Sequence, residues 1–419
     1  MTATCANDRT YDAIDLSSPQ FWATTARERE RSFAVLRAER PVSWHSPVKD
    51  TLMDDPDDPG YWAVTRRADI VAVSRNNDVF RSGKGVMFAS IPEELLEASQ
   101  SFLAMDPPRH TKLRKLVSAA FTPRQVRRIE QSIQANAKTI VEELREAGSG
   151  ADFVEYCAKE LPIRTLSDMV GIPESERQQV AHAADALVSW ADPEYLAGRE
   201  PLQVVFENQM YLHQVAGQLA AERRENPGED LFSALVNAEV DGDRLSDADV
   251  AAFFVLLAVA GNDTTRQTAS HALRALTDFP GERAWLQAAF EDRIGTAVEE
   301  FVRWATPVMT FRRTAATDFE LGGQRIQAGD KVVMFYASGN RDEEAFDEPG
   351  RFDLSRSPNP HLGFGGGGVH FCLGAHVARA QLRAIFDELL SQLPDIAAGE
   401  PVYVPGNFIH AIRSMPCTF

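Results

Sequence analysis

Apolar residues recur at three- and four-residue spacing along most of the chain, which is the spacing of one face of an α-helix. This pattern predicts long amphipathic helices over residues 123–147, 202–224, 246–276 and 373–393. Ser246 followed by Asp249 is a capping signal at the start of the third of these helices. The chain is therefore expected to be mainly α-helical.

Alternating polar and apolar residues, which are typical of β-strands, are confined to YWAVT (61–65) and to residues 311–336. Within the second region, FELGGQRIQAGDKVVMFY alternates between Gly-Gly and Gly-Asp turns and predicts a hairpin. No stretch has the composition of an interdomain linker. The expected architecture is one mainly α domain with a minor β region over residues 1–419, in which residues 1–20 form a loosely ordered N-terminal segment.

The charge balance narrows the choice of partners. In 419 residues, 43 Lys and Arg stand against 61 Asp and Glu, a formal net charge of −18, so the average surface repels nucleic acids and anionic bilayers. The longest apolar run, residues 250–260, is too short to cross a membrane, and the start lacks a signal-peptide pattern. Four widely separated cysteines fit a reducing compartment. We expect a cytoplasmic protein with no nucleic-acid partner and no membrane anchor.

In the stretch GFGGGGVHFCLG (363–374), six glycines surround a single cysteine, and a helical pattern follows. Gly363, Gly365 and Gly368 satisfy the dinucleotide-binding pattern G-x-G-x-x-G, and Asp387 lies near the distance expected for a ribose contact. However, the residues before the loop, PNPHL, are not a hydrophobic strand. The context therefore argues against nucleotide binding.

Two further interpretations concern the thiol of Cys372. A zinc site would combine it with His361, His370 and His376, although structural zinc sites usually pair cysteines or histidines at short recurrent spacings. Alternatively, a cysteine at the start of a helix is surrounded by backbone N–H groups and the positive end of the helix dipole, which favour a thiolate. Haem iron is one acceptor for such a ligand. A merely structural cysteine would not need so many glycines, each costing about 0.5–1 kcal/mol relative to alanine in regular backbone.

At this loop the chain resembles the cytochrome P450 haem-thiolate monooxygenases. Their pattern Phe-x-x-Gly-x-His/Arg-x-Cys-x-Gly is matched here by Gly368, His370, Cys372 and Gly374. The chain departs from it once, because Gly365 occupies the phenylalanine position and Phe364 comes one residue earlier. The resemblance implies the P450 fold, a single triangular haem-binding domain, with haem b (iron protoporphyrin IX) held by the axial thiolate of Cys372. It also implies insertion of one oxygen atom of O2 into an unactivated C–H bond.

The segment AGNDTT (260–265) lies in the middle of the predicted helix 246–276. A glycine beside threonines weakens a helix, because hydroxyls can bond the preceding carbonyls. The segment is therefore either a tolerated polar turn on a core helix or an opening in it. By the resemblance, Ala260 and Gly261 leave room for dioxygen, and Asp263 and Thr264 relay protons toward it.

Glu300 and Arg303 are spaced i,i+3 on a predicted helix, where they can pair. Taken alone, such a pair is as easily part of a solvated face. In the resembled family a Glu-x-x-Arg pair is joined by a downstream arginine, and Arg351 in PGRF would be that third member. The resemblance implies that these three residues hold the thiolate loop in position.

His110 and Arg114 lie at i,i+4 within MDPPRHTKLR (105–114), on one face of a predicted helix. Two cations on one face are often simply solvated. By the resemblance they bind a haem propionate, Arg313 is a further propionate contact, and His370 is a nearby cation.

No flavin or iron–sulfur motif is present, so the resemblance implies that electrons come from a ferredoxin and its reductase. Such donors are usually acidic. The expected docking face for the ferredoxin is a basic cluster near the predicted helix that carries His110. It is made of Lys112, Arg114, Lys115, Arg124, Arg127 and Arg128.

The expected substrate is a hydrophobic small molecule. Its pocket is expected to include Met87, Phe88, Ala258, Val308, Phe311 and Phe408, each of which is as easily plain core. FRRTA, AGDKVVMFY, NPHLGFGGGG and FIHAI resemble a bacterial branch that hydroxylates terminal methyl groups of methyl-branched lipids, and a neighbouring branch that acts on steroid side chains. The substrate would then be a branched lipid, an isoprenoid or a sterol side chain. Alternatives are tailoring of a secondary metabolite such as a terpenoid or macrolide, and a non-enzymatic haem carrier or sensor.

Overall fold

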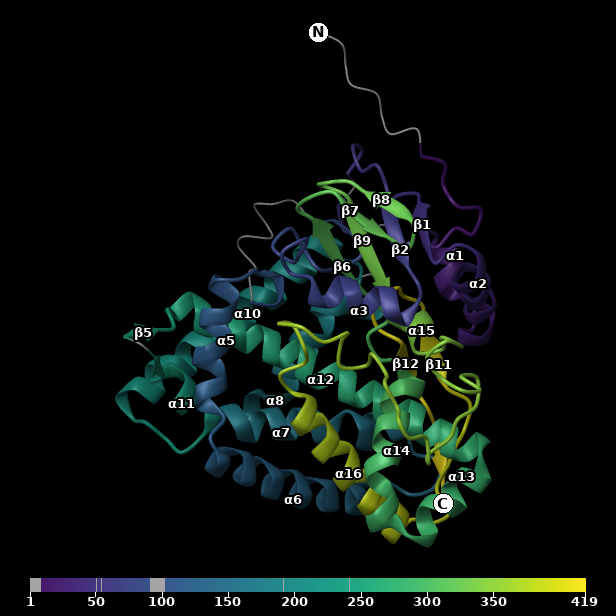
Figure 1. The fold of residues 1–419 in the computed structure, drawn as a ribbon. Helices are drawn as coiled ribbons and strands as arrows, with labels where there is room; N and C mark the ends of the chain where they lie inside the picture. Colours follow the sequence, from purple (N-terminus) through teal and green to yellow (C-terminus); the bar gives the residue numbers. More distant parts are fainter. Residues whose placement is uncertain (1–8, 50, 54, 91–101, 191, 241) are drawn as a thin grey trace.

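A computed structural model of the chain describes residues 9–49, 51–53, 55–90, 102–190, 192–240 and 242–419 (Figure 1). Helices dominate, in agreement with the spacing of apolar residues. They are α1 (Pro19–Ala23), α2 (Ala26–Glu39), α3 (Arg67–Arg75), α5 (Arg109–Ala120), α6 (Pro123–Ala147), α7 (Glu160–Val170), α8 (Glu174–Val188), α9 (Pro193–Leu196), α10 (Pro201–Glu225), α11 (Leu231–Val236), α12 (Asp247–Asp278), α13 (Pro280–Ala288), α14 (Phe290–Ala305), α15 (Tyr336–Gly339) and α16 (Ala375–Gln392). The described residues also include a 3-10 turn, η1 (Phe102–Ala104), and a π-helical turn, η2 (Val154–Ala158).

The four long helices predicted from the sequence are α6, α10, α12 and α16, and their ends follow local chemistry. The hydroxyl of Thr122 caps α6 by accepting from the backbone N–H of Gln125, and Gly148 ends the helix at a positive φ of 86°. At the start of α12, Ser246 and Asp249 form the predicted reciprocal capping box.

The strands form one five-stranded sheet and several two-stranded pieces. They are β1 (Val42–His45), β2 (Tyr61–Val64), β3 (Phe80–Arg81), β4 (Glu239–Val240), β5 (Asp243–Arg244), β6 (Thr310–Ala315), β7 (Phe319–Leu321), β8 (Gln324–Ile326), β9 (Lys331–Phe335), β10 (Ala397–Ala398), β11 (Val402–Val404), β12 (Ala411–Ser414) and β13 (Cys417–Thr418). The five-stranded sheet has the order β1-β2-β9-β6-β3. The predicted hairpin is β7–β8 around Gly322 and Gly323, whereas β9 leaves it and pairs with β2 and β6.

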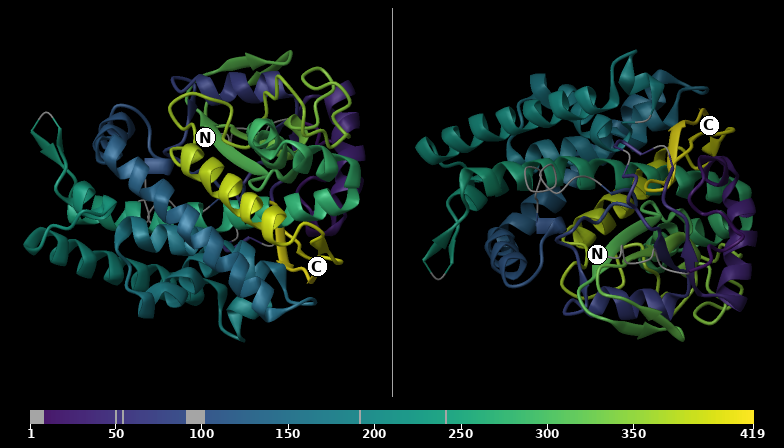
Figure 2. Two further views of the ribbon diagram at one scale, coloured as in Figure 1. Left: turned by 90° about the horizontal axis from the view of Figure 1, so that it is seen from below. Right: turned by 90° about the horizontal axis from the view of Figure 1, so that it is seen from above.

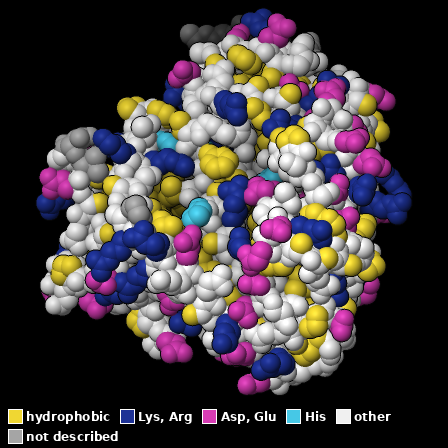
Figure 3. Space-filling view, turned by 60° about the horizontal axis from the view of Figure 1, so that its bottom comes forward, with side chains coloured by type: hydrophobic (Ala, Val, Ile, Leu, Met, Phe, Trp, Pro, Cys, Tyr) yellow, Lys and Arg dark blue, Asp and Glu magenta, His cyan; other side chains and the backbone are white. Residues whose placement is uncertain are grey.

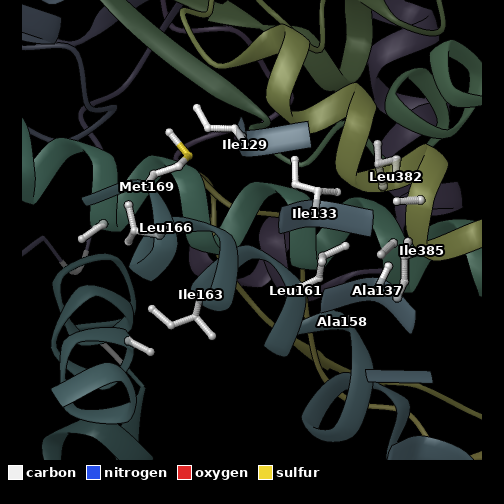
Figure 4. Packing of buried hydrophobic residues seen from close by; sticks show 14 of the residues in the cluster. Ile129, Ile133, Ala137, Ala158, Leu161, Ile163, Leu166, Met169, Leu382 and Ile385 are labelled. Atoms are coloured by element: carbon white, nitrogen blue, oxygen red, sulfur yellow. The ribbon is translucent and has the colours of Figure 1, made fainter. Parts of the chain in front are cut away.

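The helical core is centred on α12, which packs against α7, α8, α10, α14 and α16. Figures 1 and 2 show this helix crossing the middle of the molecule, with the main sheet on one side and α6 to α8 on the other. Figure 4 shows the apolar layer beneath it, where Ile133 of α6, Leu161 of α7 and Leu382 of α16 point toward one another. Full burial of each such side chain contributes about 1.5–3 kcal/mol.

Among the described residues, α12 is the one helix that is long and apolar enough to cross a membrane by length and composition. Its packing against the surrounding helices accounts for that composition, because the core helix of a globular protein meets the same criteria.

The expectation of a loosely ordered segment 1–20 is wrong for its described part, residues 9–20. Leu16 is fully buried, and the N–H of Asp12 donates to the carbonyl of Trp44. Arg9 forms an ion pair with Asp330 at 2.9 Å. Residues 1–8 lie outside the described part of the chain.

Candidate active site

A mainly apolar cavity lies between α12 and the glycine loop 363–374, with α7, α16 and β6 forming its other walls. Ala260, Gly261 and Thr264 line it from α12, and Cys372 and Gly374 line it from the loop. The structure therefore brings together, on opposite walls of one cavity, motifs that lie about a hundred residues apart in the sequence.

The glycines of the loop are required by its backbone and by its contact with α3. Gly365, Gly367 and Gly368 have φ values of 96°, 92° and 77°. Residues other than glycine rarely adopt this backbone conformation. A Cβ on Gly366 would lie 2.4 Å from the Ser74 hydroxyl of α3. These glycines let the loop lie flat against α3 while its other side faces the cavity.

This geometry explains the departure from the family pattern. The left-handed conformation at Gly365 disfavours a phenylalanine there. Phe364, one residue earlier, instead lines the cavity, and its carbonyl accepts from the backbone N–H of Cys372 at 3.0 Å. The aromatic ring is thus kept beside the cysteine.

The thiol of Cys372 is exposed to the cavity. Burial within the protein raises its pKa, although the backbone N–H of Gly374 and the guanidinium of Arg114 act in the opposite direction. The start of α16 therefore does not by itself make this sulfur a thiolate, contrary to the sequence-based argument. A bound metal ion deprotonates a coordinating thiol, so the thiolate is expected when iron is in place.

Four basic side chains meet at one end of the cavity. His370, Arg114 and Arg313 line it, and the His110 ring lies 4.3 Å from that of His370, centroid to centroid. His110 is fully buried, and neither of its ring nitrogens has a partner; Nε of Arg313 is also without one. Unpartnered buried donors of this kind fit an anionic group such as a haem propionate. Burial, together with the neighbouring Arg313, lowers the pKa of the His370 ring to about 3, so without an anion beside it this histidine is not the cation expected from the sequence.

On α12, the structure separates the two members of the acid–alcohol pair. Thr264 faces the cavity, and its hydroxyl donates to the carbonyl of Ala260 at 2.8 Å. Asp263 is buried and is not among the residues that line the cavity. Its Oδ1 accepts from Arg266 and from Gln267. The acid is therefore turned away from the alcohol.

Arg266 also donates to Asp185 of α8 at 2.7 Å, so one arginine joins α8 to α12. Burial raises the pKa of Asp185. Sequence reasoning missed this link. The i,i+3 spacing of Asp263 and Arg266 was visible in the sequence, but their partner on α8 was not.

The Glu300–Arg303 pair is fully buried, with two hydrogen bonds of 2.7 Å. Arg351 is not its third member. The Arg351 side chain is 56% exposed and pairs with Glu348, and only its backbone carbonyl contacts Arg303. Instead, Nε of the buried Arg356 lies 3.3 Å from Oε2 of Glu300.

The expected pocket residues divide into two groups. Val308 and Phe311 line the cavity, and the ring of Phe408 contacts that of Phe311 without itself reaching the lining. Met87, Phe88 and Ala258 do not line it. Phe88 packs with Trp22, Tyr61 and Phe335, and Ala258 lies in the core. The apolar lining that sequence reasoning missed includes Phe102, Leu103, Leu166, Met169, Phe253, Leu256 and Leu257.

The structure removes two of the alternative interpretations of the glycine loop. The loop follows no strand, and the main sheet has only one parallel pair, β2 with β9, so a nucleotide-binding βαβ unit is absent from the described residues. His361 pairs with Glu299 and His376 with Glu130, so these histidines do not converge on Cys372. Within the described ranges no group of His, Cys, Asp or Glu is arranged to hold a metal ion.

The arrangement fits a haem. The cavity offers a cysteine sulfur on one wall and the small residues Ala260 and Gly261 on the other. At one end lies a group of basic side chains, among which both ring nitrogens of His110 and Nε of Arg313 have no hydrogen-bond partner. When bound, the haem supplies the chemistry that activates O2 and transfers one of its oxygen atoms to a C–H bond.

Comparisons with known proteins agree. The sequence profile of the cytochrome P450 family matches residues 70–393. The chain is 42% identical over 410 residues to a methyl-branched lipid omega-hydroxylase of Mycobacterium tuberculosis, covering 97% of this chain and 94% of that protein. It is 39% identical over 408 residues to a steroid C26-monooxygenase of Rhodococcus jostii, covering 96% of this chain and 84% of that protein.

Among solved structures, the Mycobacterium marinum cytochrome P450 CYP268A2 in complex with pseudoionone superimposes with a TM-score of 0.95. It is 81% identical, over 98% of this chain and 99% of that one. Because the relatives are monooxygenases, the alternative of a non-enzymatic haem carrier or sensor is removed. The protein is a monooxygenase that uses a cysteine-ligated haem, O2, a redox partner and a hydrophobic substrate. The chain belongs to the cytochrome P450 family.

Proposed function

We propose that this P450 hydroxylates a terminal methyl group of a methyl-branched lipid, an isoprenoid or a sterol side chain. The observation that carries the proposal is the 42% identity to a methyl-branched lipid omega-hydroxylase over nearly the full length of both chains. The similarity to a steroid C26-monooxygenase, and to a P450 that binds pseudoionone, a methyl-branched ketone, points to the same class of substrate. The apolar lining supports it, because Phe311, Leu256 and Phe253 offer nothing for a polar substrate to bind.

Side chains on different walls of the cavity would have different roles in binding the substrate, the haem and a proton. Val308 and Phe311 on one wall and Leu256 and Leu257 on the other would hold the apolar chain so that its end lies over the iron. His110, Arg114, Arg313 and His370 would bind the propionates. Thr264 would hold a proton on its hydroxyl at the cavity wall beside Ala260 and Gly261.

A panel of fatty acids that differ at the chain terminus tests the substrate class. We expect a fatty acid with one methyl branch at its terminus to displace the iron-bound water about fourfold more tightly than the straight-chain acid that lacks this methyl group, because one buried methylene-sized group is worth about 0.8 kcal/mol. Product analysis should find the new hydroxyl on a terminal methyl carbon.

The competing function is tailoring of a terpenoid or macrolide secondary metabolite. Tighter binding of a macrolide, or oxygen placed on a ring carbon of a terpenoid, would favour that alternative and contradict terminal hydroxylation. Both substrate groups are to be compared in the same holoenzyme preparation, so that haem content does not decide the outcome.

We further infer that electrons come from a ferredoxin and its reductase, and that the acidic, cysteine-poor chain acts in the cytoplasm. On the face in Figure 3, lysine and arginine side chains gather near a hollow that exposes hydrophobic side chains. Several cations of the expected docking cluster form ion pairs with carboxylates. Lys112 pairs with Asp243, and Arg124 and Arg128 share Glu229. Arg114 instead points to the loop, donating to the carbonyl of Phe371.

Reversing the charge of Arg124 and Arg127 is expected to slow reduction of the haem by an acidic ferredoxin by roughly tenfold or more at low salt, since electrostatic steering raises association rates by about 10- to 1,000-fold. The measurement is stopped-flow reduction at several ionic strengths. Arg325→Glu on β8 is the matched control, because that arginine is as exposed as Arg124 and likewise pairs with an exposed carboxylate, that of Asp318. Unchanged rates and salt dependence in the double variant would refute this docking face.

A further inference from the structure

Behind the cysteine loop, Arg379 of α16 lies over an aromatic ring that belongs to the active-site wall. Its Cζ is 4.3 Å from the centroid of the Phe364 ring, a cation–π distance. Phe364 lines the cavity, and its carbonyl holds the backbone N–H of Cys372 at 3.0 Å. Phe364 therefore contacts both the Arg379 guanidinium and the backbone of the sulfur ligand, Cys372.

Glu299 of α14 fixes the orientation of this arginine. Its carboxylate accepts from Nε of Arg379 at 2.5 Å and from Nη2 at 3.0 Å, which is a bidentate pairing. The same carboxylate contacts Nε2 of His361 at 2.9 Å, and Nδ1 of His361 accepts from the N–H of Gly363 at 3.1 Å. One carboxylate thus holds the loop at its start through His361 and in its middle through Arg379 and Phe364.

The charges of this assembly act on the sulfur. Burial tends to raise the pKa of Glu299, but hydrogen bonds from Arg379 and His361 outweigh it and hold that pKa at about 2, so the carboxylate is charged at neutral pH. Arg379 and Arg114 are cations close to the cysteine: Arg379 lies over the Phe364 ring, and Arg114 donates to the carbonyl of Phe371, the residue before Cys372. Arg114 lies at the cavity side of the loop, and Arg379 lies behind it.

We propose that Arg379, oriented by Glu299, is a positioning residue that raises the reduction potential of the haem through its charge and through its support of Phe364 and the Cys372 loop. The physical reason is that reduction adds one electron, delivered by the redox partner, to the haem and its thiolate. A cation held near the sulfur stabilises that added negative charge. In this loop the ring that lies under the guanidinium is that of Phe364, the residue before Gly365. The inference rests on the cysteine-ligated haem and not on the choice of substrate.

The test is the reduction potential of the substrate-free holoenzyme, measured by spectroscopic redox titration. Arg379→Gln is expected to shift the potential to more negative values, and Arg379→Lys is expected to restore part of the shift. Glu299→Gln removes a negative charge and is expected to shift the potential the opposite way. Arg383→Gln is the matched control, since Arg383 lies one turn further along α16 and pairs with Glu291; it should leave the potential close to that of the parent.

The visible spectrum of the carbon monoxide adduct is recorded in parallel to confirm thiolate ligation. Potentials of Arg379→Gln and Arg383→Gln that shift equally, or not at all, would overturn the proposal. If Arg379→Gln loses thiolate ligation because it leaves the Glu299 carboxylate without its partner, the double variant Glu299→Gln/Arg379→Gln is compared with Glu299→Gln. A more negative potential in the double variant supports the role of the arginine's charge, and equal potentials refute it. Because no substrate is present, a failure here is distinct from a failure of the proposed substrate class.

Discussion

Replacement of Thr264 by alanine is expected to leave haem and substrate binding in place while most of the reducing equivalents leave as hydrogen peroxide instead of entering product. Thr264 lines the cavity from α12, and its hydroxyl donates to the carbonyl of Ala260, which lines the same wall with Gly261. Proton delivery by a positioned group typically contributes about 10²- to 10⁴-fold to a rate. NADH consumption, product and peroxide are to be measured together, because product yield alone does not distinguish slow turnover from diverted electrons.

Thr264→Ser is the matched variant, since it keeps the hydroxyl and removes only the methyl group. We expect it to retain most of the product yield per NADH. A Thr264→Ala enzyme that still converts nearly every electron pair into product would exclude the hydroxyl as the proton donor. The proton would then have to reach the cavity by another route.

The position of Asp263 bears on the same step. Its carboxylate is engaged by Arg266 and Gln267, and Arg266 is held in turn by Asp185 of α8. In this arrangement the acid cannot pass a proton directly to Thr264. A relay through both residues would require Asp263 to exchange one of these partners.

Much of the fold could be predicted from local sequence. The boundaries of α6 follow from Thr122, Pro123 and Gly148, which act through contacts within a few residues of the helix ends. The capping box of α12 is equally local. The pairing of β9 with β2 is not local, because it joins residues more than 260 positions apart. For that reason the sequence pattern placed β9 in a hairpin with its neighbours.

In the site too, features set by local sequence could be predicted, whereas features set by contacts between distant segments could not. The loop motif identified Cys372, because glycines and a following helix are visible in the sequence. The pocket residues were less predictable, since Phe88 and Phe311 are alike in sequence and differ only in which core they join. The third arginine of the Glu300 cluster was misassigned for a related reason. Arg351 and Arg356 flank the same short segment, and only the path of the backbone decides which side chain turns inward.

With Arg356 rather than Arg351 as the third member of the Glu300 cluster, the loss of stability is expected to decrease from Arg303 to Arg356 to Arg351. Arg303→Leu leaves the buried carboxylate of Glu300 without its main partner, and loss of one member of a buried pair costs about 3–5 kcal/mol. It also removes the hydrogen bonds to the carbonyls of Asn340, Pro349 and Arg351. Since Asn340 accepts from the N–H of Leu362 at the start of the cysteine loop, we expect loss of haem as well as loss of stability.

Arg356→Ala should have an intermediate effect, because Asp353 and Asn359 still donate to Glu300. Arg351→Ala should change stability by less than about 1 kcal/mol, as is usual for exposed pairs. Haem content per chain and thermal unfolding midpoints of the three variants are the measurements. If Arg351→Ala proved as damaging as Arg303→Leu, or Arg356→Ala proved harmless, the third member would be Arg351 after all. The cysteine loop would then be anchored through a side chain that this structure places in solvent.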